Sequence, residues 1–452
     1  MSLKPLTENI GNNQMIIDKF FNYINNLKKC PVLFLSPLAY AIGNCSEEIY
    51  FGLLKARRED KKLILLYPYN LPFWLIKYKL TNNEIFKVDS EYIYFRDDNF
   101  FHHVVRTCVT LVYLPIRLMS LWLRDIFGVT SLSVSYRFPR IGLDSIYEKT
   151  NNFTWSAVRS KYWGSQFKEY LPVGLRKNNI KRAGRKLSEM GISADDWFVC
   201  VHAREGGFKN DARRREYRNM QISNYIKAFE RIIEKGGWVI RMGDDTMAKL
   251  PEMERVIDYP FTKFKSDLMD VFLINQCRFF IGSQSGPLDI ASLFQKPTLI
   301  VNMVNWTYNY PWFYHSRGIL KNFYCHTKKR ILTIQEIFEG PWSLQDMYGV
   351  GVVASEYELY DNSADDIEEA VVEYMDLLES QQFNQSPLQK EVNEIRISTS
   401  HDIFETVRFT DYSDHEETIQ KYRVACRVED SKGAICQKFL EKNWKKSSYK
   451  IK

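Results

Sequence analysis

Two short motifs place chemically capable side chains directly after apolar runs. The first, VCVHAR, ends in His202 and Arg204, and the second, GSQSGP, occupies Gly282–Pro287. Alternate residues of a strand share one face, so His202 and Arg204 are predicted to point together. Arginine is the natural bidentate partner of phosphate oxygens. The first motif therefore indicates an anion site, against the alternative that Arg204 forms a structural ion pair with Glu205 or an aspartate.

The second motif has the composition of a loop that opens a helix onto an anion. Gly282 and Gly286 let the backbone approach a ligand closely, and Pro287 suits the first helical position. Free amides at a helix start, together with its positive end, attract anions. Side-chain hydrogen bonds would come from the polar residues between the glycines, Ser283, Gln284 and Ser285. An ordinary strand-to-helix turn that binds nothing is the alternative.

Further polar residues are expected at the same edge of the sheet, because ligands of open α/β sheets bind beyond the carboxyl ends of the strands. We assign to the ligand site, beside the two motifs, Arg218, Asn219, Arg241, Gly243, Asp244, Asp258 and Tyr259. Asp258 and Tyr259 would line the pocket. For these two, a simple turn before Pro260 is the alternative.

Three carboxylates are candidates for a general base. Asp211 and Glu205 belong to the long loop after His202, where functional residues concentrate, although a charge run such as ARRREYR is usually a solvated face. Glu47 begins a predicted helix of the N-terminal half and would reach the crevice from the opposite wall. A favourable charge at a helix N-terminus is its alternative role. No DxD-type metal motif stands in a convincing context, so we expect a site without metal.

The elements that would position these residues alternate between strand and helix. In the N-terminal half, a strand at 32–36, a helix at 47–57 and a strand at 62–67 predict a parallel right-handed crossover. Apolar runs and helical periodicity in the second half predict strands at 197–202, 238–242, 256–257, 278–281 and 298–301, with helices at 222–234, 266–276 and 287–294. This alternation indicates a doubly wound parallel sheet.

The predicted fold class is α/β, with two Rossmann-like doubly wound domains and a C-terminal extension. We place the first domain at 1–174 and the second, which carries the two motifs, at 175–385. The extension, 386–452, is polar, so a disordered tail and a segment that packs back on the N-terminal domain are both open. A chain of 452 residues exceeds the usual size of one domain, which favours this division.

Composition excludes wholesale disorder and gives little support to nucleic-acid binding. Hydrophobic residues make up 45% and charged residues 26%, as in ordinary globular proteins. The net charge of +7 is mild for this length, and no RRM, zinc or helix-turn-helix signature accompanies it. The eight cysteines form no CxxC pair, and several lie inside apolar runs as reduced buried cysteines do, which indicates a reducing compartment. Because the N-terminus has no apolar signal region, a cytoplasmic protein is expected.

The most apolar stretch, residues 104–123, bears on localisation. It reads VVRTCVTLVYLPIRLMSLWL and contains two arginines and Pro115. A membrane-spanning helix needs about 20 mostly uncharged residues, so the charges and the proline argue against one. A buried helix pair is the favoured interpretation. The alternative is a helix on a membrane surface, which would bring the protein to a lipid-linked substrate at the inner membrane.

Residues 175–305, with both motifs in order, resemble a family of bacterial GT-B-like glycosyltransferases of surface-polysaccharide loci. The arrangement is also similar to that of the fucosyltransferase superfamily, where a His-x-Arg strand end and a Ser/Gly loop hold the diphosphate of a nucleotide sugar. By this resemblance, Arg204 and Ser283–Gly286 would bind the diphosphate. His202 and Asp244 would support the sugar or the nucleoside.

The resemblance implies transfer of a hexosyl or deoxyhexosyl group from a nucleotide-sugar donor to a hydroxyl of a glycan or lipid-linked acceptor, without metal or cofactor. A GDP-sugar is favoured over a UDP-sugar. The alternative is a non-catalytic nucleotide- or sugar-binding module of a polysaccharide assembly complex, which would need no base. A dinucleotide-dependent enzyme is disfavoured, because no G-x-G-x-x-G follows a predicted strand.

Overall fold

The computed structural model describes eleven stretches of the chain: 32–35, 37, 41–69, 80–94, 100–127, 170–207, 216–304, 306, 310–339, 357–406 and 432–445. The chain divides into two compact units. Unit 1 comprises Met1–Pro37, Ile49–Lys79 and Asp89–Asp144, and unit 2 comprises Leu38–Glu48, Leu80–Val88 and Ser145–Lys452. Two short segments of the N-terminal half therefore join unit 2, where the sequence suggested a single boundary at 174.

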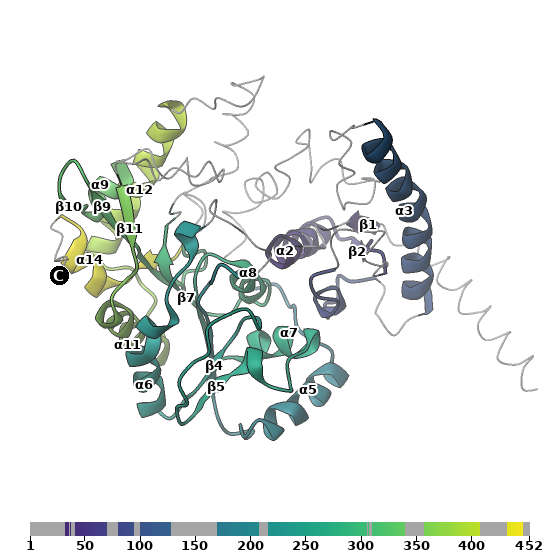
Figure 1. The fold of residues 1–452 in the computed structure, drawn as a ribbon, viewed down its shortest axis with the longest axis horizontal. Helices are drawn as coiled ribbons and strands as arrows, with labels where there is room; N and C mark the ends of the chain where they lie inside the picture. Colours follow the sequence, from purple (N-terminus) through teal and green to yellow (C-terminus); the bar gives the residue numbers. More distant parts are fainter. Residues whose placement is uncertain are drawn as a thin grey trace, which may run out of the picture. The chain divides into compact units, whose positions relative to one another are not determined.

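Unit 1 is built on the predicted strand–helix–strand crossover. β1 (Val32–Leu35) and β2 (Lys62–Leu65) pair in parallel and are connected through α2 (Ile42–Arg58). α3 (Phe100–Phe127) covers this small sheet, with Val109 packed on Ile64 and Leu66 (Figure 1). The described part of unit 1 holds this two-stranded sheet, so a doubly wound N-terminal domain stays a prediction.

The interpretation of 104–123 as a buried helix pair is wrong. α3 is one helix of 28 residues that contains Pro115, and several large apolar side chains along it are exposed. Proline inside a helix removes one backbone hydrogen bond, but here the helix continues through it. Among the described helices, α3 included, none combines the length and the hydropathy that crossing a bilayer requires.

Unit 2 contains a seven-stranded sheet in which all pairings are parallel, in the order β12-β8-β7-β6-β3-β4-β5. Five of its strands match predicted ones: β3 (Phe198–His202), β4 (Trp238–Arg241), β5 (Val256–Asp258), β6 (Phe279–Gly282) and β7 (Thr298–Met303). Every residue of β3, β6 and β7 is buried, as expected of central parallel strands covered on both faces. The prediction of an α/β fold with a large parallel sheet is confirmed.

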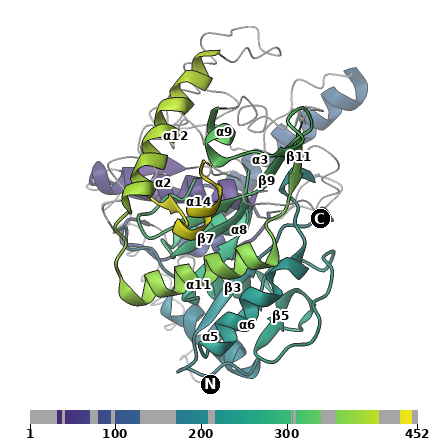
Figure 2. The ribbon, with the colours of Figure 1, turned by 90° about the vertical axis from the view of Figure 1, so that its left-hand side faces the viewer.

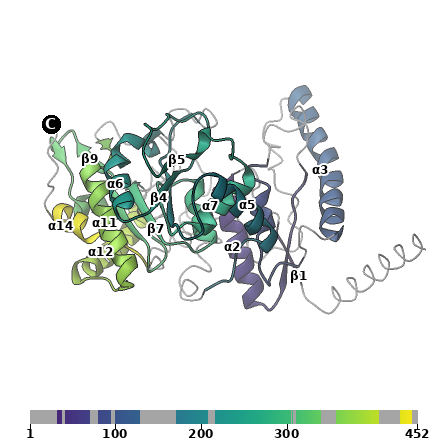
Figure 3. The same ribbon diagram turned by 90° about the horizontal axis from the view of Figure 1, so that it is seen from below.

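Helices cover both faces of this sheet. α6 (Ile226–Glu234) and α11 (Ala364–Ser380) lie on one face, and α5 (Lys177–Glu189), α7 (Asp267–Gln276) and α8 (Gly286–Leu293) lie on the other (Figures 1 and 3). Ser266 caps the start of α7, because its Oγ accepts a hydrogen bond from the Met269 amide at 3.4 Å. Short 3₁₀ turns stand at Glu84–Lys87, Glu216–Arg218, Ile222–Tyr225 and Tyr259–Phe261.

The remaining elements extend unit 2 beyond its predicted strands. β8 (Arg317–Leu320) and β12 (Ala434–Ile435) complete the large sheet, and β9 (Asn322–Cys325), β10 (Arg330–Ile331) and β11 (Tyr357–Tyr360) form a small antiparallel one. α9 (Ile334–Glu339), α12 (Pro387–Thr406) and α14 (Gln437–Asn443) follow, and α12 and α14 lie together beside α11 (Figure 2). Because β12 pairs with β8, the described part of 386–452 belongs to unit 2.

Candidate functional site

The strand order of the large sheet reverses between β3 and β6. The chain adds β4 and β5 on one side of β3, and then β6, β7 and β8 on the other. His202 and Gly282, the last residues of β3 and β6, are direct partners in the register. Ligands of such sheets bind outside the carboxyl ends of the strands at this reversal. The structure therefore brings the two sequence motifs together where a ligand is expected.

A side-chain contact joins the two motifs. Ser285 Oγ lies 3.0 Å from His202 Nδ1 and donates to the Ser283 carbonyl at 3.2 Å. Ser285 directly precedes α8, yet its hydroxyl makes no capping hydrogen bond to the first turn of that helix. The amides at the positive end of α8 therefore have no side-chain cap, which is the arrangement that favours a bound anion.

His202 is electrically neutral in this environment. Burial, aided by the positive charges of Arg241 and Arg204 and opposed by Asp244, lowers the pKa of His202 to about 3. At neutral pH the imidazole consequently carries no charge. It orients Ser285 and contributes no cation of its own to the site.

The depressed pKa of His202 predicts acid lability. An unfolded histidine takes up a proton below about pH 6.5, whereas folded His202 does so only near pH 3, so its contribution to stability is present above pH 6.5 and is lost between these values. In His202→Gln, the fall in unfolding free energy from pH 6.5 to 4 should be shallower, by at most about 1.4 kcal/mol per pH unit. Urea unfolding at several pH values measures this. The exposed His326→Gln is the control, and equal slopes in all three proteins would refute the prediction.

In the described part of the chain, two buried donors of the glycine loop and of the segment that contacts it have no hydrogen-bond partner. They are Ser283 Oγ, in a residue only 1% exposed, and Arg218 Nε. Arg218 Nη1 donates to the Gln284 carbonyl at 3.3 Å, so this guanidinium lies at the glycine loop. Gln284 is fixed in turn, because its Oε1 accepts from the Val304 amide at 3.0 Å. Unmet buried donors cost about 1–3 kcal/mol each, and an anion supplies acceptors.

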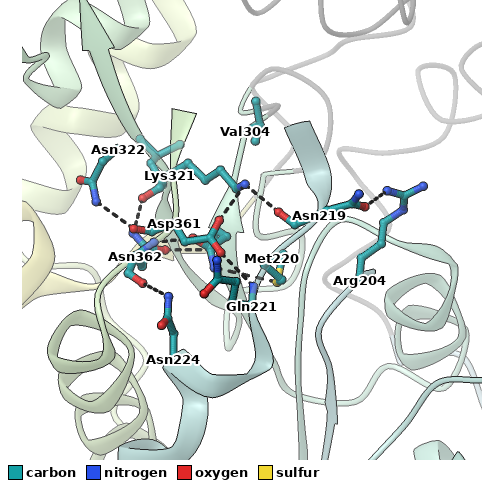
Figure 4. Close-up of polar contacts among 12 residues, drawn as sticks. Arg204, Asn219, Met220, Gln221, Asn224, Val304, Lys321, Asn322, Asp361 and Asn362 are labelled. Carbon is teal, nitrogen blue, oxygen red and sulfur yellow. Dashed lines mark hydrogen bonds and ion pairs between the residues drawn. The ribbon is translucent and has the colours of Figure 1, made fainter. Parts of the chain in front are cut away.

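Arg204 is tied to the segment that carries Arg218. Its Nη1 donates to Asn219 Oδ1, and its carbonyl accepts from the Met220 amide at 3.0 Å (Figure 4). The chain thus leaves the sheet at Arg204 and returns to the same place at Asn219. Two of the three arginines that sequence reasoning assigned to the ligand, Arg204 and Arg218, are therefore fixed by this segment, and Arg218 lies at the glycine loop.

An ion pair that sequence reasoning missed holds this returning segment. Lys321 Nζ lies 2.8 Å from Asp361 Oδ1 and donates to the Asn219 carbonyl at 2.8 Å. Asp361 Oδ2 accepts from the Gln221 amide at 2.9 Å (Figure 4). Lys321 is only 3% exposed. We refer to these two residues as the Lys321–Asp361 clamp, because they grip the backbone on both sides of Met220.

The clamp rests on a reciprocal asparagine pair. The Asn302 amide donates to Asn362 Oδ1 at 2.9 Å, and the Asn362 amide donates to Asn302 Oδ1 at 2.6 Å. Asn302 has a φ of +55°, a left-handed conformation that asparagine adopts more easily than most residues. Asn362 Nδ2 also donates to the Leu320 carbonyl at 2.6 Å. The carboxyl ends of β7 and β8 are thereby joined to the residues before α11.

Three of the predicted site residues form a buried cluster instead of presenting themselves to a ligand. Arg241, with no exposed surface, donates to Asp258 Oδ1 at 2.8 Å and to Glu205 Oε1 at 3.0 Å. The other oxygens of the two carboxylates accept backbone amides, Glu205 from Ala248 and Asp258 from Leu250. The structural ion pair considered for Arg204 is thus made by Arg241, and it anchors the loop after β4.

The other predicted site residues, which follow β4 and β5, stabilise the turns in which they lie. Tyr259 is fully buried, and its hydroxyl accepts from the Ser266 amide at 3.1 Å, which secures the start of α7. Asp244 Oδ1 accepts from the Thr246 amide at 3.0 Å. Gly243 has a φ of +151°, and a Cβ there would come within 2.2 Å of Met247 Sδ. Among the described residues, no group of three or more His, Cys, Asp or Glu side chains is arranged to hold a metal ion.

Of the three candidate bases, the structure describes Glu205 and Glu47. Asp211 lies outside the described residues. Glu47 is 5% exposed in the first turns of α2, in the part of that helix that belongs to unit 2. This helix start contacts the start of α8, because a Cβ on Gly43 would lie 2.2 Å from Asp289 Oδ2 and a Cβ on Gly286 would lie 2.6 Å from Ile42 Cγ2. Two glycines thus allow two helix N-termini to meet at the site.

Comparisons with known proteins find distant similarities only. No family model and no curated protein matches the chain. A glycosyl transferase of family 9 from Veillonella parvula DSM 2008 is 10% identical over 78% of this chain and 97% of its own, with a TM-score of 0.37. The dodecameric iron-containing heptosyltransferase TibC, from enterotoxigenic E. coli H10407, is 12% identical over 41% of this chain. Two structures of TibC match, each with a TM-score of 0.24, and one of them is a complex with ADP-D-beta-D-heptose. The matched region spans about half of TibC, 47%. At these values the similarities establish neither fold nor activity.

Proposed function

We propose that this protein is a GT-B-like glycosyltransferase that moves a sugar from a nucleotide-sugar donor to a hydroxyl of a glycan or lipid-linked acceptor in bacterial surface polysaccharide synthesis. The observation that carries the proposal is the joining of His202 and Ser285 at the reversal of strand order, beside unmet donors of Ser283 and Arg218. The resemblance of residues 175–305 supports the sugar-transfer chemistry. Neither the donor sugar nor its nucleotide is specified by these contacts.

The diphosphate of the donor is proposed to bind between the two arginines and the start of α8. Arg204 and Arg218 offer guanidinium groups, Ser283 offers a hydroxyl, and the uncapped first turn of α8 offers amides. Charge-assisted hydrogen bonds of this type are about twice as strong as neutral ones. The same groups would stabilise the negative charge that develops on the departing nucleoside diphosphate. We therefore propose a reaction without metal, with a GDP-sugar as the favoured donor.

The cluster of Arg241, Glu205 and Asp258 is proposed to support the site. Both carboxylates are already bonded to Arg241 and to backbone amides. Each of the four carboxylate oxygens thus already accepts a hydrogen bond from the protein. We therefore propose that Glu205 holds the loop after β4 in place and that the base lies elsewhere.

Asp211 is proposed as the general base, with Glu47 as the alternative. The base takes the proton of the acceptor hydroxyl. At the same time the acceptor oxygen forms a bond to the anomeric carbon of the donor sugar, and the bond from that carbon to the diphosphate oxygen breaks. The loop that contains Asp211 begins at Arg204 and ends at Arg218 and Asn219, all at the proposed diphosphate site. We propose that the reaction takes place at the cytoplasmic side of the inner membrane.

A nucleotide panel tests the donor site. A ligand that binds only the folded state stabilises it, by about 2.7 kcal/mol at 100 times its Kd. We expect GDP or another nucleoside diphosphate to raise the melting temperature in a thermal-shift assay, whereas inorganic phosphate at equal concentration should act much more weakly. If no nucleoside diphosphate shifts the transition, the donor site is refuted.

Turnover separates an enzyme from a binding module. Nucleotide sugars that raise the melting temperature should also be hydrolysed slowly by the protein, with nucleoside diphosphate detected by mass spectrometry. A protein that binds nucleotide sugars and yields no product with any acceptor would instead be the non-catalytic module of a polysaccharide assembly complex.

A further inference from the structure

The helix α3 of unit 1 presents a broad apolar face that no described element covers. Large side chains at 44–64% exposure recur along it, namely Leu111, Leu118, Met119, Trp122 and Ile126. At about 100° of rotation per residue, these positions fall within an arc of roughly 100°. We call these five residues the outer face of α3. Unlike scattered surface apolar residues, a continuous apolar face marks an interaction surface.

Two polar residues on the opposite face of α3 are buried inside unit 1. Arg106 is buried, with Nη2 bonded to the Pro68 carbonyl at 3.1 Å and its guanidinium 3.9 Å from the centre of the Tyr69 ring. His102 is buried against the Tyr67 hydroxyl at 3.0 Å. One of the two arginines that argued against a membrane-spanning helix, Arg106, is thus buried inside unit 1. The outer face is left apolar.

Charge on unit 1 indicates the kind of surface that this face would meet. By sequence, unit 1 contains 17 Lys and Arg against 10 Asp and Glu, an excess of seven. The whole chain also has an excess of seven basic residues, so unit 2 is balanced, with 45 basic and 45 acidic residues. An anionic bilayer attracts a domain with an excess of basic groups, and an apolar helix face combined with basic residues is typical of an interfacial helix.

We infer that α3 docks unit 1 on an anionic membrane surface, with its outer face in the headgroup region. A second copy of this chain fits less well, because the outer face is wider than a coiled-coil seam and has the exposed Pro115 within its length. Docking is independent of the proposed donor site. If that function also holds, the docked helix selects acceptors linked to lipid.

Vesicle sedimentation of the full chain tests this inference. The protein should pellet with vesicles of phosphatidylcholine containing about a third phosphatidylglycerol, more weakly with phosphatidylcholine alone, and less as salt is raised. Because each leucine of the outer face would be removed from water on docking, Leu111→Glu and Leu118→Glu should each lower the partition coefficient by about tenfold or more.

Ile180→Glu is the matched control, since Ile180 is an exposed apolar residue of a helix in unit 2. It should pellet like the native protein, and circular dichroism should show equal folding of all variants. Three results would overturn the inference: no pelleting of native protein with anionic vesicles, pelleting of both leucine variants equal to that of the native protein, or a lipid-free dimer that Leu111→Glu dissociates. The thermal shift with nucleoside diphosphate, measured without vesicles, separates any such failure from failure of the donor site.

Discussion

Asp211→Asn is expected to lower the rate of sugar transfer about 10²- to 10⁴-fold while nucleotide binding is retained, because a positioned general base contributes a factor of this size. The amide has the shape of the carboxylate but cannot accept the proton of the acceptor hydroxyl. Asp211 stands in the loop whose two ends meet through Arg204 and Asn219. Initial rates at saturating donor, with thermal shifts on the same preparation, measure the two effects separately.

Two matched variants make this result specific. Glu205→Gln should weaken folding more than turnover, because it removes a charged partner from the fully buried Arg241. Glu47→Gln tests the other candidate, near the contact between the starts of α2 and α8. A large loss of rate in Glu47→Gln, with Asp211→Asn fully active, would move the base to α2. Full activity in both variants would place it elsewhere.

Arg204→Ala is expected to weaken binding of a nucleoside diphosphate about 10- to 100-fold. Hydrogen bonds to charged groups contribute about 1.5–3 kcal/mol, and each 1.4 kcal/mol changes affinity tenfold. Arg204→Lys should recover only part of the affinity, because an ammonium group cannot form the bidentate contact of a guanidinium. Titration calorimetry with GDP measures these affinities, and melting without ligand reports the separate loss of the Asn219 contact.

Arg218→Ala should weaken binding in the same way, since its Nε is an unmet donor beside the glycine loop. Arg231 provides the control, because it is an exposed arginine of α6 whose ion pairs with Glu234 and Glu368 lie on the surface. Arg231→Ala should bind nucleotide like the native protein. Native affinity in Arg204→Ala and Arg218→Ala together would remove the diphosphate from this edge of the sheet.

The sequence predicted the large sheet well because its central strands are buried on both faces. Such strands appear as continuous apolar runs, as in β3, β6 and β7. The motifs that end β3 and β6 follow directly from those runs. Their meeting at His202 and Ser285 could be anticipated, since carboxyl ends of parallel strands share an edge.

The polar environment of the site could not be predicted in the same way. Arg241 and Arg204 both follow or end a strand, and only three dimensions show that Arg241 is enclosed by two carboxylates. Lys321 and Asp361 carry no local pattern, because their partners lie far away in the chain. The strands β8 and β12 are short and have no long apolar run. Local periodicity cannot identify contacts of this kind.

The Lys321–Asp361 clamp affects the order in which parts of the molecule fold. The hydrogen bond from the Gln221 amide to Asp361 joins residues 140 positions apart in the chain. Contacts at such separation close late, because the loop entropy must be overcome first. A nascent chain that has emerged only as far as β7 contains His202, Arg204 and the glycine loop but lacks both clamp residues. Competence for a ligand therefore follows assembly of the strands β3 to β7 as a separate, later event.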